Sequence, residues 1–213
     1  MTISTPSDSD RDEIEKHIAH YIGNIRGTFQ DETTNNMPIQ VHHVCPTTEK
    51  PWHILITSGM SNLPMTTPPG IDCPKYAELM MCLPGDWKMD QESLKDKVWH
   101  WPIVWLRYLA KYPHENNTGF AYGHSIPHSY PPEPFSKNTK LCASIFTLPV
   151  LVSQEFWQLH VTDRSIVFYC VEPIYQEELN LRIEIGMDEL VNRMDRYGIT
   201  EVVSLNRKNV GLI

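Results

Sequence analysis

Histidines are the side chains of this 213-residue chain that most often serve metal binding or proton transfer. They form three close groups: His17 with His20, His42 with His43, and His124 with His128. No group has the H-E-x-x-H pattern that sets two zinc ligands on one helix face, and adjacent strand residues such as 42 and 43 point to opposite faces. The pair at 124 and 128 therefore best fits a metal or acid-base role, against the commoner role of a solvated or hydrogen-bonded histidine.

Glutamates and serines offer two further kinds of chemistry. Glu177 and Glu178 follow a predicted strand, close to Glu172 and Glu184, and paired carboxylates can act as general acid and base. An acidic helix start that interacts favourably with the helix dipole is the simpler interpretation. Ser58 follows an apolar run but lacks the G-x-S-x-G order of a nucleophile elbow, so a turn role is favoured.

The cysteines and glycines do not form a recognisable cofactor site. The five cysteines are scattered, without a C-x-x-C pair, and we expect reduced thiols in the core at Cys45, Cys73, Cys82, Cys142 and Cys170. The ten glycines include no phosphate-binding loop pattern. We therefore expect no disulfide, no metal and no cofactor.

Charge and hydropathy narrow the class of partner. The formal net charge is −8, and no block of lysine and arginine occurs, which disfavours nucleic acid and anionic membranes as partners. The longest apolar stretch, residues 142–152, is short and contains Pro149, and the first residues lack a signal-peptide pattern. These features predict a cytoplasmic protein, and the length suits one domain with one core.

The first half of the chain predicts one helix and three strands. Apolar residues recur at helical spacing from residue 14 to 25, before Gly27. Two β-rich runs at residues 41–45 and 52–57 are expected to pair as a hairpin. Residues 76–83 form an apolar strand whose only charge is Glu78, which predicts a central position in a sheet.

The second half predicts further helices and strands. A helix from residue 91 onward is expected to have its boundary at Trp101–Pro102 and to stop at Pro113. Short or apolar strands are predicted at residues 119–126, 141–152, 166–171 and 201–205, with a helical region after residue 173 divided at Gly186. This irregular order predicts an α+β fold with a mixed, largely antiparallel central sheet flanked by helices.

The strand that breaks at Gly59 is expected to present a loop. Met60 and Met65 follow this break, and we expect them to be exposed for contact. Tryptophans near the middle helix and the Pro-rich loops favour core packing, with aromatic anchors of a protein-binding surface as the alternative.

Several segments together resemble the suppressor of fused family. They occur in the family's order and read WHILITSGMSNLPM, YAELMMCLPGDW, WPIVWLRYLAKYPHENNT, the strand into VEPIYQEEL, IGMDELVNRM and VVSLNR. The resemblance covers about residues 39–210 of a single domain spanning 1–213, with residues 1–38 as an N-terminal helix and linker. It is closest to the short bacterial, single-domain members.

This resemblance implies a non-catalytic protein-binding domain. Animal members clamp a short peptide between two lobes and add it as a strand. Tyr112 and His124 match a family tyrosine and histidine, whereas Gly123 stands where animal members have an acidic residue. The partner-binding residues expected here are Tyr112, Tyr122, Gly123, His124, Met60 and Met65.

The resemblance also implies a cellular role. Some short bacterial members act as immunity proteins that neutralise a toxin by direct binding, so the expected partner is a protein such as a toxin or a peptide segment. The alternative function is a hydrolase or metal-dependent enzyme that uses His124 and His128, or Glu177 and Glu178.

Overall fold

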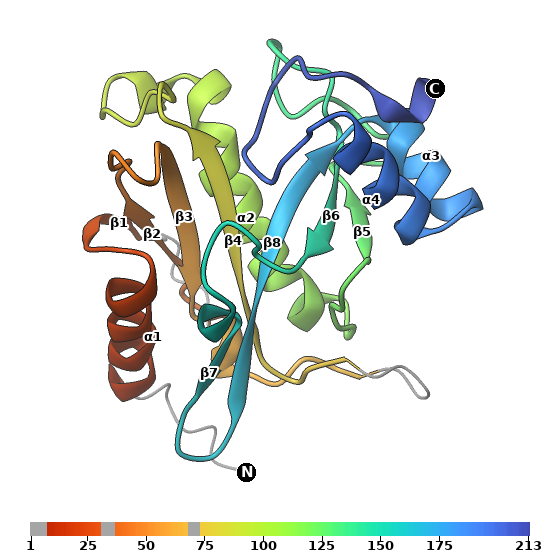
Figure 1. Cartoon of the computed structure of the whole chain (residues 1–213). Helices are drawn as coiled ribbons and strands as arrows, with labels where there is room; N and C mark the ends of the chain where they lie inside the picture. Colours follow the sequence, from red (N-terminus) through yellow and green to blue (C-terminus); the bar gives the residue numbers. More distant parts are fainter. Residues whose placement is uncertain (1–7, 31–36, 68–72) are drawn as a thin grey trace.

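An eight-stranded sheet forms the centre of the protein (Figure 1). The computed structural model describes residues 8–30, 37–67 and 73–213. The strands are β1 (Ile25–Phe29), β2 (Gln40–Val44), β3 (Trp52–Ser58), β4 (Ala77–Pro84), β5 (Ser125–Pro127), β6 (Ala143–Thr147), β7 (Gln158–His160) and β8 (Ser165–Ile174). Their order is β1-β2-β3-β4-β8-β6-β5, with β7 also paired to β8. Among the described strands only β4 and β8 pair in parallel, so the sheet is mixed and largely antiparallel, as predicted.

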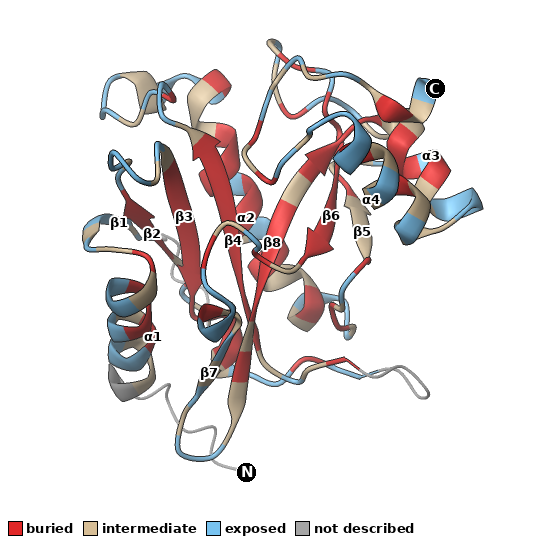
Figure 2. Cartoon of the chain, in the orientation of Figure 1, coloured by how far each residue is buried: buried red, intermediate tan, exposed pale blue. Residues whose placement is uncertain are grey.

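Helices cover both faces of this sheet (Figure 1). They are α1 (Asp8–Tyr21), α2 (Lys97–Glu115), α3 (Gln176–Glu184) and α4 (Met187–Arg196). One face packs on α2 through a core that includes Leu79, Met81, Leu106 and Leu109. The opposite face is divided: α1 covers the part near β3 and β4, and α3 with α4 covers the part near β6. Figure 2 shows β3, β4 and β6 buried along nearly their whole length, whereas β5 at the edge is only partly buried.

The predicted hairpin and central strand are confirmed. Strands β2 and β3 pair antiparallel, and β4 lies between β3 and β8. Glu78, the one charge in β4, is fully buried and accepts hydrogen bonds from Thr57, Gly59 and Ser61 at 2.6–3.0 Å. Burial raises the pKa of Glu78, while these donors oppose the shift. The Ser-Gly-Met-Ser turn is therefore held by a buried carboxyl and builds the fold.

The expectation that Met60 and Met65 are exposed is wrong. Met60 is 0% and Met65 is 4% exposed, and both belong to the core under α2. The reason is the backbone at Gly59, where a φ of 112° turns the chain inward to a short 3₁₀ helix, Met60–Asn62. A flexible methionine fills the irregular space beneath such a turn.

Three helix boundaries differ from prediction. The first helix ends at Tyr21, and Ile25 begins β1, so the helical spacing of apolar residues continues by coincidence into a strand. Helix α2 begins at Lys97, because the Asp96 side chain accepts a hydrogen bond from the amide of Val98 at 3.0 Å. Both prolines then lie inside the helix, which ends at Glu115 and not at Pro113.

Three predicted strands are shorter in the structure than predicted or do not form. Residues 119–126 supply only part of β5, and residues 141–152 supply the shorter β6. Residues 201–205 form no strand; a single parallel bridge joins Val202 to Cys82. In contrast, residues 166–171 lie within β8, and Gly186 does separate α3 from α4.

The tryptophans and cysteines are mostly core residues. Trp87, Trp101 and Trp105 are at most 5% exposed, which confirms core packing for them. All five cysteines are free, and four are buried. Cys45 is the exception: it lies just after β2 ends, where the chain leaves the sheet, and it is exposed.

Candidate partner-binding site

Strand β5 is an open edge of the sheet. It pairs with β6 on one side, and within the described chain no strand pairs with its other side. The amide of His128 donates to the carbonyl of Cys142 at 2.8 Å, and Ile126 with Ser144 forms the next such pair two residues along. Ser125 and Pro127 therefore direct their backbone groups outward.

The outward groups of β5 are few. Ser125 offers an N–H and a carbonyl, whereas Pro127 is buried and, as a proline, has no N–H. A short edge strand with a proline resists indiscriminate pairing. This edge can accept one short extended segment, held by a small number of backbone hydrogen bonds.

Tyrosines of α2 flank the edge on one face of the sheet. Tyr108 is 44% exposed, its ring stacks on buried Trp105 with centroids 5.0 Å apart, and it contacts half-buried Tyr112 at 5.8 Å. Partial burial raises the pKa of Tyr108, and Tyr112 and Tyr130 add to the shift. Tyr130 follows β5 and is 85% exposed. Rigid, half-exposed tyrosines are typical anchors of protein interfaces.

A shallow cavity of about 380 Å³ lies beside these rings. Its lining residues are Lys97, His100, Trp101, Val104, Trp105, His128 and Phe135. His128 sits edge-on to Trp105 with centroids 5.4 Å apart, and its Nδ1 lies 3.0 Å from the carbonyl of Glu133. The imidazole thus belongs to an aromatic wall on the α2 side.

The segment before β5 reaches the opposite face. Tyr122 is 48% exposed, and burial of part of its ring together with nearby Asp188 raises its pKa. Gly123 has a φ of +79°, and a Cβ there would lie 3.3 Å from the side chain of Met187. Its carbonyl accepts a hydrogen bond from Nε of Arg182 at 2.9 Å, which ties this segment to α3. A larger residue at position 123 would meet both α4 and backbone strain.

His124 is a neutral, half-buried side chain. Burial and the charge of Arg182 lower its pKa, against the backbone at Gly119, which raises it. The structure places His124 near α3 and His128 in the aromatic wall near α2, so the two histidines have different surroundings. Among the described residues neither is part of a group of three potential metal ligands.

A second cavity, of about 340 Å³, lies on the face that Tyr122 reaches. It separates the α1 and α4 sides of that face, and its walls come from Tyr122, Ile145, Thr147, Leu148, Val150, Trp157, Glu172, Val191, Met194, Asp195, Ile199, Thr200 and Glu201. Most of this lining is apolar, and its polar groups include the carboxyls of Glu172, Asp195 and Glu201. We call it the acidic cavity.

Two carboxyls give the acidic cavity its chemistry. Burial raises the pKa of Glu172 to about 7, Glu201 adds to the shift, and the hydroxyl of Thr147 donates to Glu172 at 2.5 Å. Burial also raises the pKa of Glu201, whose oxygens accept the amides of Val150 and Leu151 at 3.1 and 2.5 Å. Such a pair favours a cationic or hydrogen-bond-donating group in the cavity.

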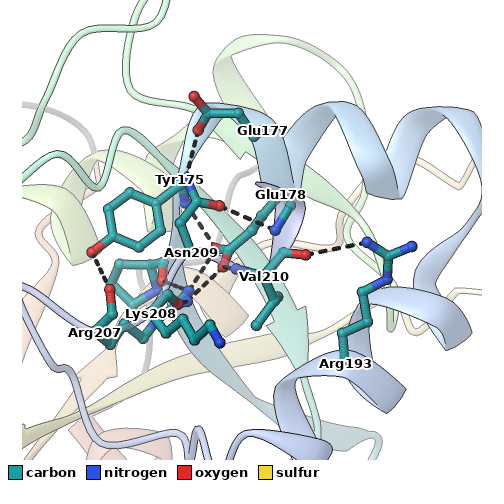
Figure 3. A network of polar contacts seen from close by, with 10 residues as sticks. Tyr175, Glu177, Glu178, Arg193, Arg207, Lys208, Asn209 and Val210 are labelled. Atoms are coloured by element: carbon teal, nitrogen blue, oxygen red, sulfur yellow. Dashed lines mark hydrogen bonds and ion pairs between the residues drawn. The ribbon is translucent and has the colours of Figure 1, made fainter. Parts of the chain in front are cut away.

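Glu178 performs a structural task in the network of Figure 3. It is 0% exposed, and its two oxygens lie 2.6 and 2.7 Å from the guanidinium of Arg207. The same carboxylate accepts the backbone amides of Tyr175 and Val210, each at 3.0 Å, and Glu177 accepts Nδ2 of Asn209 at 2.7 Å. These carboxylates join the start of α3 to the C-terminal segment, which leaves Glu178 poorly suited to proton transfer.

Ser58 also takes part in a buried contact. Its hydroxyl lies 2.8 Å from Nε2 of His42, and both residues are at most 1% exposed. Burial lowers the pKa of His42 to about 4, far from the value near 7 that suits a general base. The pair stabilises the β2–β3 hairpin.

The structure therefore groups some expected site residues and separates others. Tyr122, Gly123 and His124 directly precede β5, and Tyr112 on α2 stacks on Phe120 a few residues earlier, whereas Met60 and Met65 lie in the core. Sequence reasoning missed the acidic cavity. Its one signal was Glu172 inside an otherwise apolar strand, which was grouped with Glu177 and Glu178 by sequence proximity.

No helix among the described residues is long and apolar enough to cross a membrane.

The fold and the open edge define a class: an α+β protein with an exposed sheet edge suited to binding another polypeptide. A sequence model of the suppressor of fused protein (SUFU) family matches residues 35–208. The chain belongs to the suppressor of fused family.

Solved structures have the same fold. A suppressor of fused homologue from Neisseria gonorrhoeae FA 1090 matches with a TM-score of 0.66 and 18% identity, over 96% of each chain. The structure of a Sufu–Fu complex matches with a TM-score of 0.64 and 13% identity, over 97% of this chain and 92% of the other. Drosophila Suppressor of Fused matches with a TM-score of 0.62 and 14% identity, over 97% of this chain and 51% of the Drosophila chain. The comparison with curated proteins gave no match.

Proposed function

We propose that this chain is a non-catalytic protein-binding domain that holds an extended segment of a partner at the outer edge of β5. The open edge itself supports the proposal: the outward backbone groups of Ser125 lie between the tyrosines of α2 and the acidic cavity. Backbone pairing would supply affinity, and the two flanking surfaces would select side chains on alternate faces.

The two flanking surfaces specify different side chains. Tyr108, Tyr112 and Tyr130 suit an apolar or cationic side chain, because aromatic rings bind both. Glu172 and Glu201 suit a lysine, an arginine or a hydrogen-bond donor on the other face. With a net charge of −8, the protein would also attract a basic partner over longer distances.

The family suggests the cellular role. A short bacterial member that acts as a cytoplasmic immunity protein, binding and neutralising a basic toxin, fits the acidic charge and the open edge. Co-expression with a toxin encoded beside its gene should restore growth of the host, and calorimetry should show a one-to-one complex. Unrelieved toxicity together with no measurable binding would contradict the immunity role.

The edge itself can be tested at one position. Ser125→Pro removes the only outward N–H of β5, so affinity for the partner should fall by about tenfold or more, the value of one lost hydrogen bond. Ser125→Ala keeps the N–H and is the matched control. Equal binding by both folded variants would exclude strand addition at β5 and would leave protein binding elsewhere to be mapped.

The enzyme hypothesis has its own test. If the domain is non-catalytic, the purified natural protein should show no hydrolytic activity that depends on His124 or His128. The variants His124→Ala and His128→Ala should both still bind the partner measurably. A hydrolytic activity that copurifies with the protein and disappears in His124→Ala would favour the enzyme alternative.

A further inference from the structure

Three potential metal ligands converge at the connection between β2 and β3, far in the strand order from β5. His43 and Cys45 are two residues apart, so they point to the same face as the chain extends beyond β2. His43 lies opposite Leu55 in the register, and His53 is two residues before Leu55 on the same face. The hairpin thus brings His53 across from Cys45.

The distances support a shared site. Nε2 of His43 lies 2.8 Å from Nδ1 of His53, and Sγ of Cys45 and one ring nitrogen of each histidine all lie within 4.8 Å of one another. His43 is 6% and His53 is 8% exposed, whereas Cys45 is exposed. The group is buried on its imidazole side and open to solvent on its thiol side.

The surroundings of His53 also suit a metal ligand. Burial lowers its pKa, and hydrogen bonding with the backbone at Gly85 and Trp87 opposes this shift. Metal-binding histidines are usually oriented by a hydrogen bond at the ring nitrogen that does not bind the ion.

We propose that His43, Cys45 and His53 bind a Zn²⁺ ion, with the fourth position open toward solvent. Two imidazoles and one thiolate are ligands that zinc accepts, and three protein ligands leave one position for water. Tetrahedral bonds of about 2.0 Å separate two ligand nitrogens by about 3.3 Å, so the imidazoles need to part by only about 0.5 Å.

Binding changes the protons of the site in a defined way. The thiol of Cys45 loses its proton to solvent and becomes a thiolate ligand. The proton between the two imidazoles cannot stay there; it moves to the ring nitrogen that faces away from the ion, so that each ring presents a lone pair to the metal. Zinc binding therefore releases one proton.

Cobalt titration of the metal-free, full-length protein tests the proposal. Co²⁺ should bind with one-to-one stoichiometry and give a thiolate-to-cobalt charge-transfer band, which Zn²⁺ should then abolish by displacement. Cys45→Ser should remove this band and weaken Zn²⁺ binding by about 100-fold or more, since even outer-shell changes cost about 10- to 100-fold. His20→Gln, a change at an exposed histidine of α1, should alter neither.

A second measurement needs no substitution. Cys45 is the one exposed thiol, so a thiol reagent should modify one cysteine quickly in the metal-free protein, and Zn²⁺ should protect it. The proposal is overturned if no charge-transfer band forms, if the band persists in Cys45→Ser, or if Zn²⁺ leaves the thiol fully reactive. The two histidines would then be a neutral hydrogen-bonded pair that packs the hairpin.

Discussion

Glu172 is the residue whose ionisation should most affect the fold near neutral pH. Its pKa rises from 4.5 to about 7 in the folded protein, so the folded state holds a proton that the unfolded state releases. The contribution of protonated Glu172 to the free energy of unfolding is fully present below about pH 4.5. It falls by up to about 3 kcal/mol as the pH rises through about 7.

Glu172→Gln should remove this dependence of the free energy of unfolding on pH. Denaturant unfolding at about pH 5 and about pH 8 should show a smaller loss of stability with pH in this variant than in the natural protein. Glu133→Gln, at an exposed site, is the control and should keep the slope. Identical slopes in all three proteins would mean that Glu172 ionises normally.

The ion pair of Glu178 and Arg207 makes a prediction about buried charge. Removal of one partner leaves the other buried without compensation, so Glu178→Gln or Arg207→Met should each cost about 3–5 kcal/mol of unfolding free energy. The double variant should be less destabilised than the sum of the two, which a urea-unfolding cycle measures. Additive effects would show that the two charges stabilise the protein separately.

At the scale of elements, the turn after β3 depends on one glycine. Gly59 has a φ of +112°, and a Cβ there would lie 2.5 Å from the carbonyl oxygen of Pro38. Gly186 has a similar φ of +115° but open space around it. Gly59→Ala should therefore destabilise the protein more than Gly186→Ala, whose cost should be about 1–3 kcal/mol from the backbone alone. Thermal unfolding of both variants checks this, and equal losses would contradict it.

The elements also show where sequence reasoning works and where it fails. The β-rich and apolar runs were sufficient for the β2–β3 hairpin and for β4, and Gly186 was sufficient for the separation of α3 from α4. It failed at Ile25, where a residue with helical spacing pairs with Val44 in a sheet, and at Pro102, where the cap at Asp96 and continuous packing outweigh the proline. Tertiary contacts decided these cases.

At the scale of the whole molecule, the site residues come from distant parts of the chain. The acidic cavity unites Tyr122, Glu172 and Glu201 only because β5 and β8 both flank β6 and the segment after α4 folds back over them. The zinc site depends on strand register, which also is not visible from spacing alone. Family resemblance indicated the fold and the region around Tyr112 and His124, but neither cavity.

The parallel pairing of β4 with β8 affects how the protein is made. Strands β1 to β4 form a continuous meander, yet one side of the largely apolar β4 has no neighbour until residues 165–174 have been synthesised. During synthesis, the nascent chain therefore carries an unpaired hydrophobic strand edge while more than eighty further residues are added. Exposed strand edges of this kind promote aggregation. Premature stops before β8 should thus yield insoluble fragments that burden chaperones, and not smaller versions of the domain.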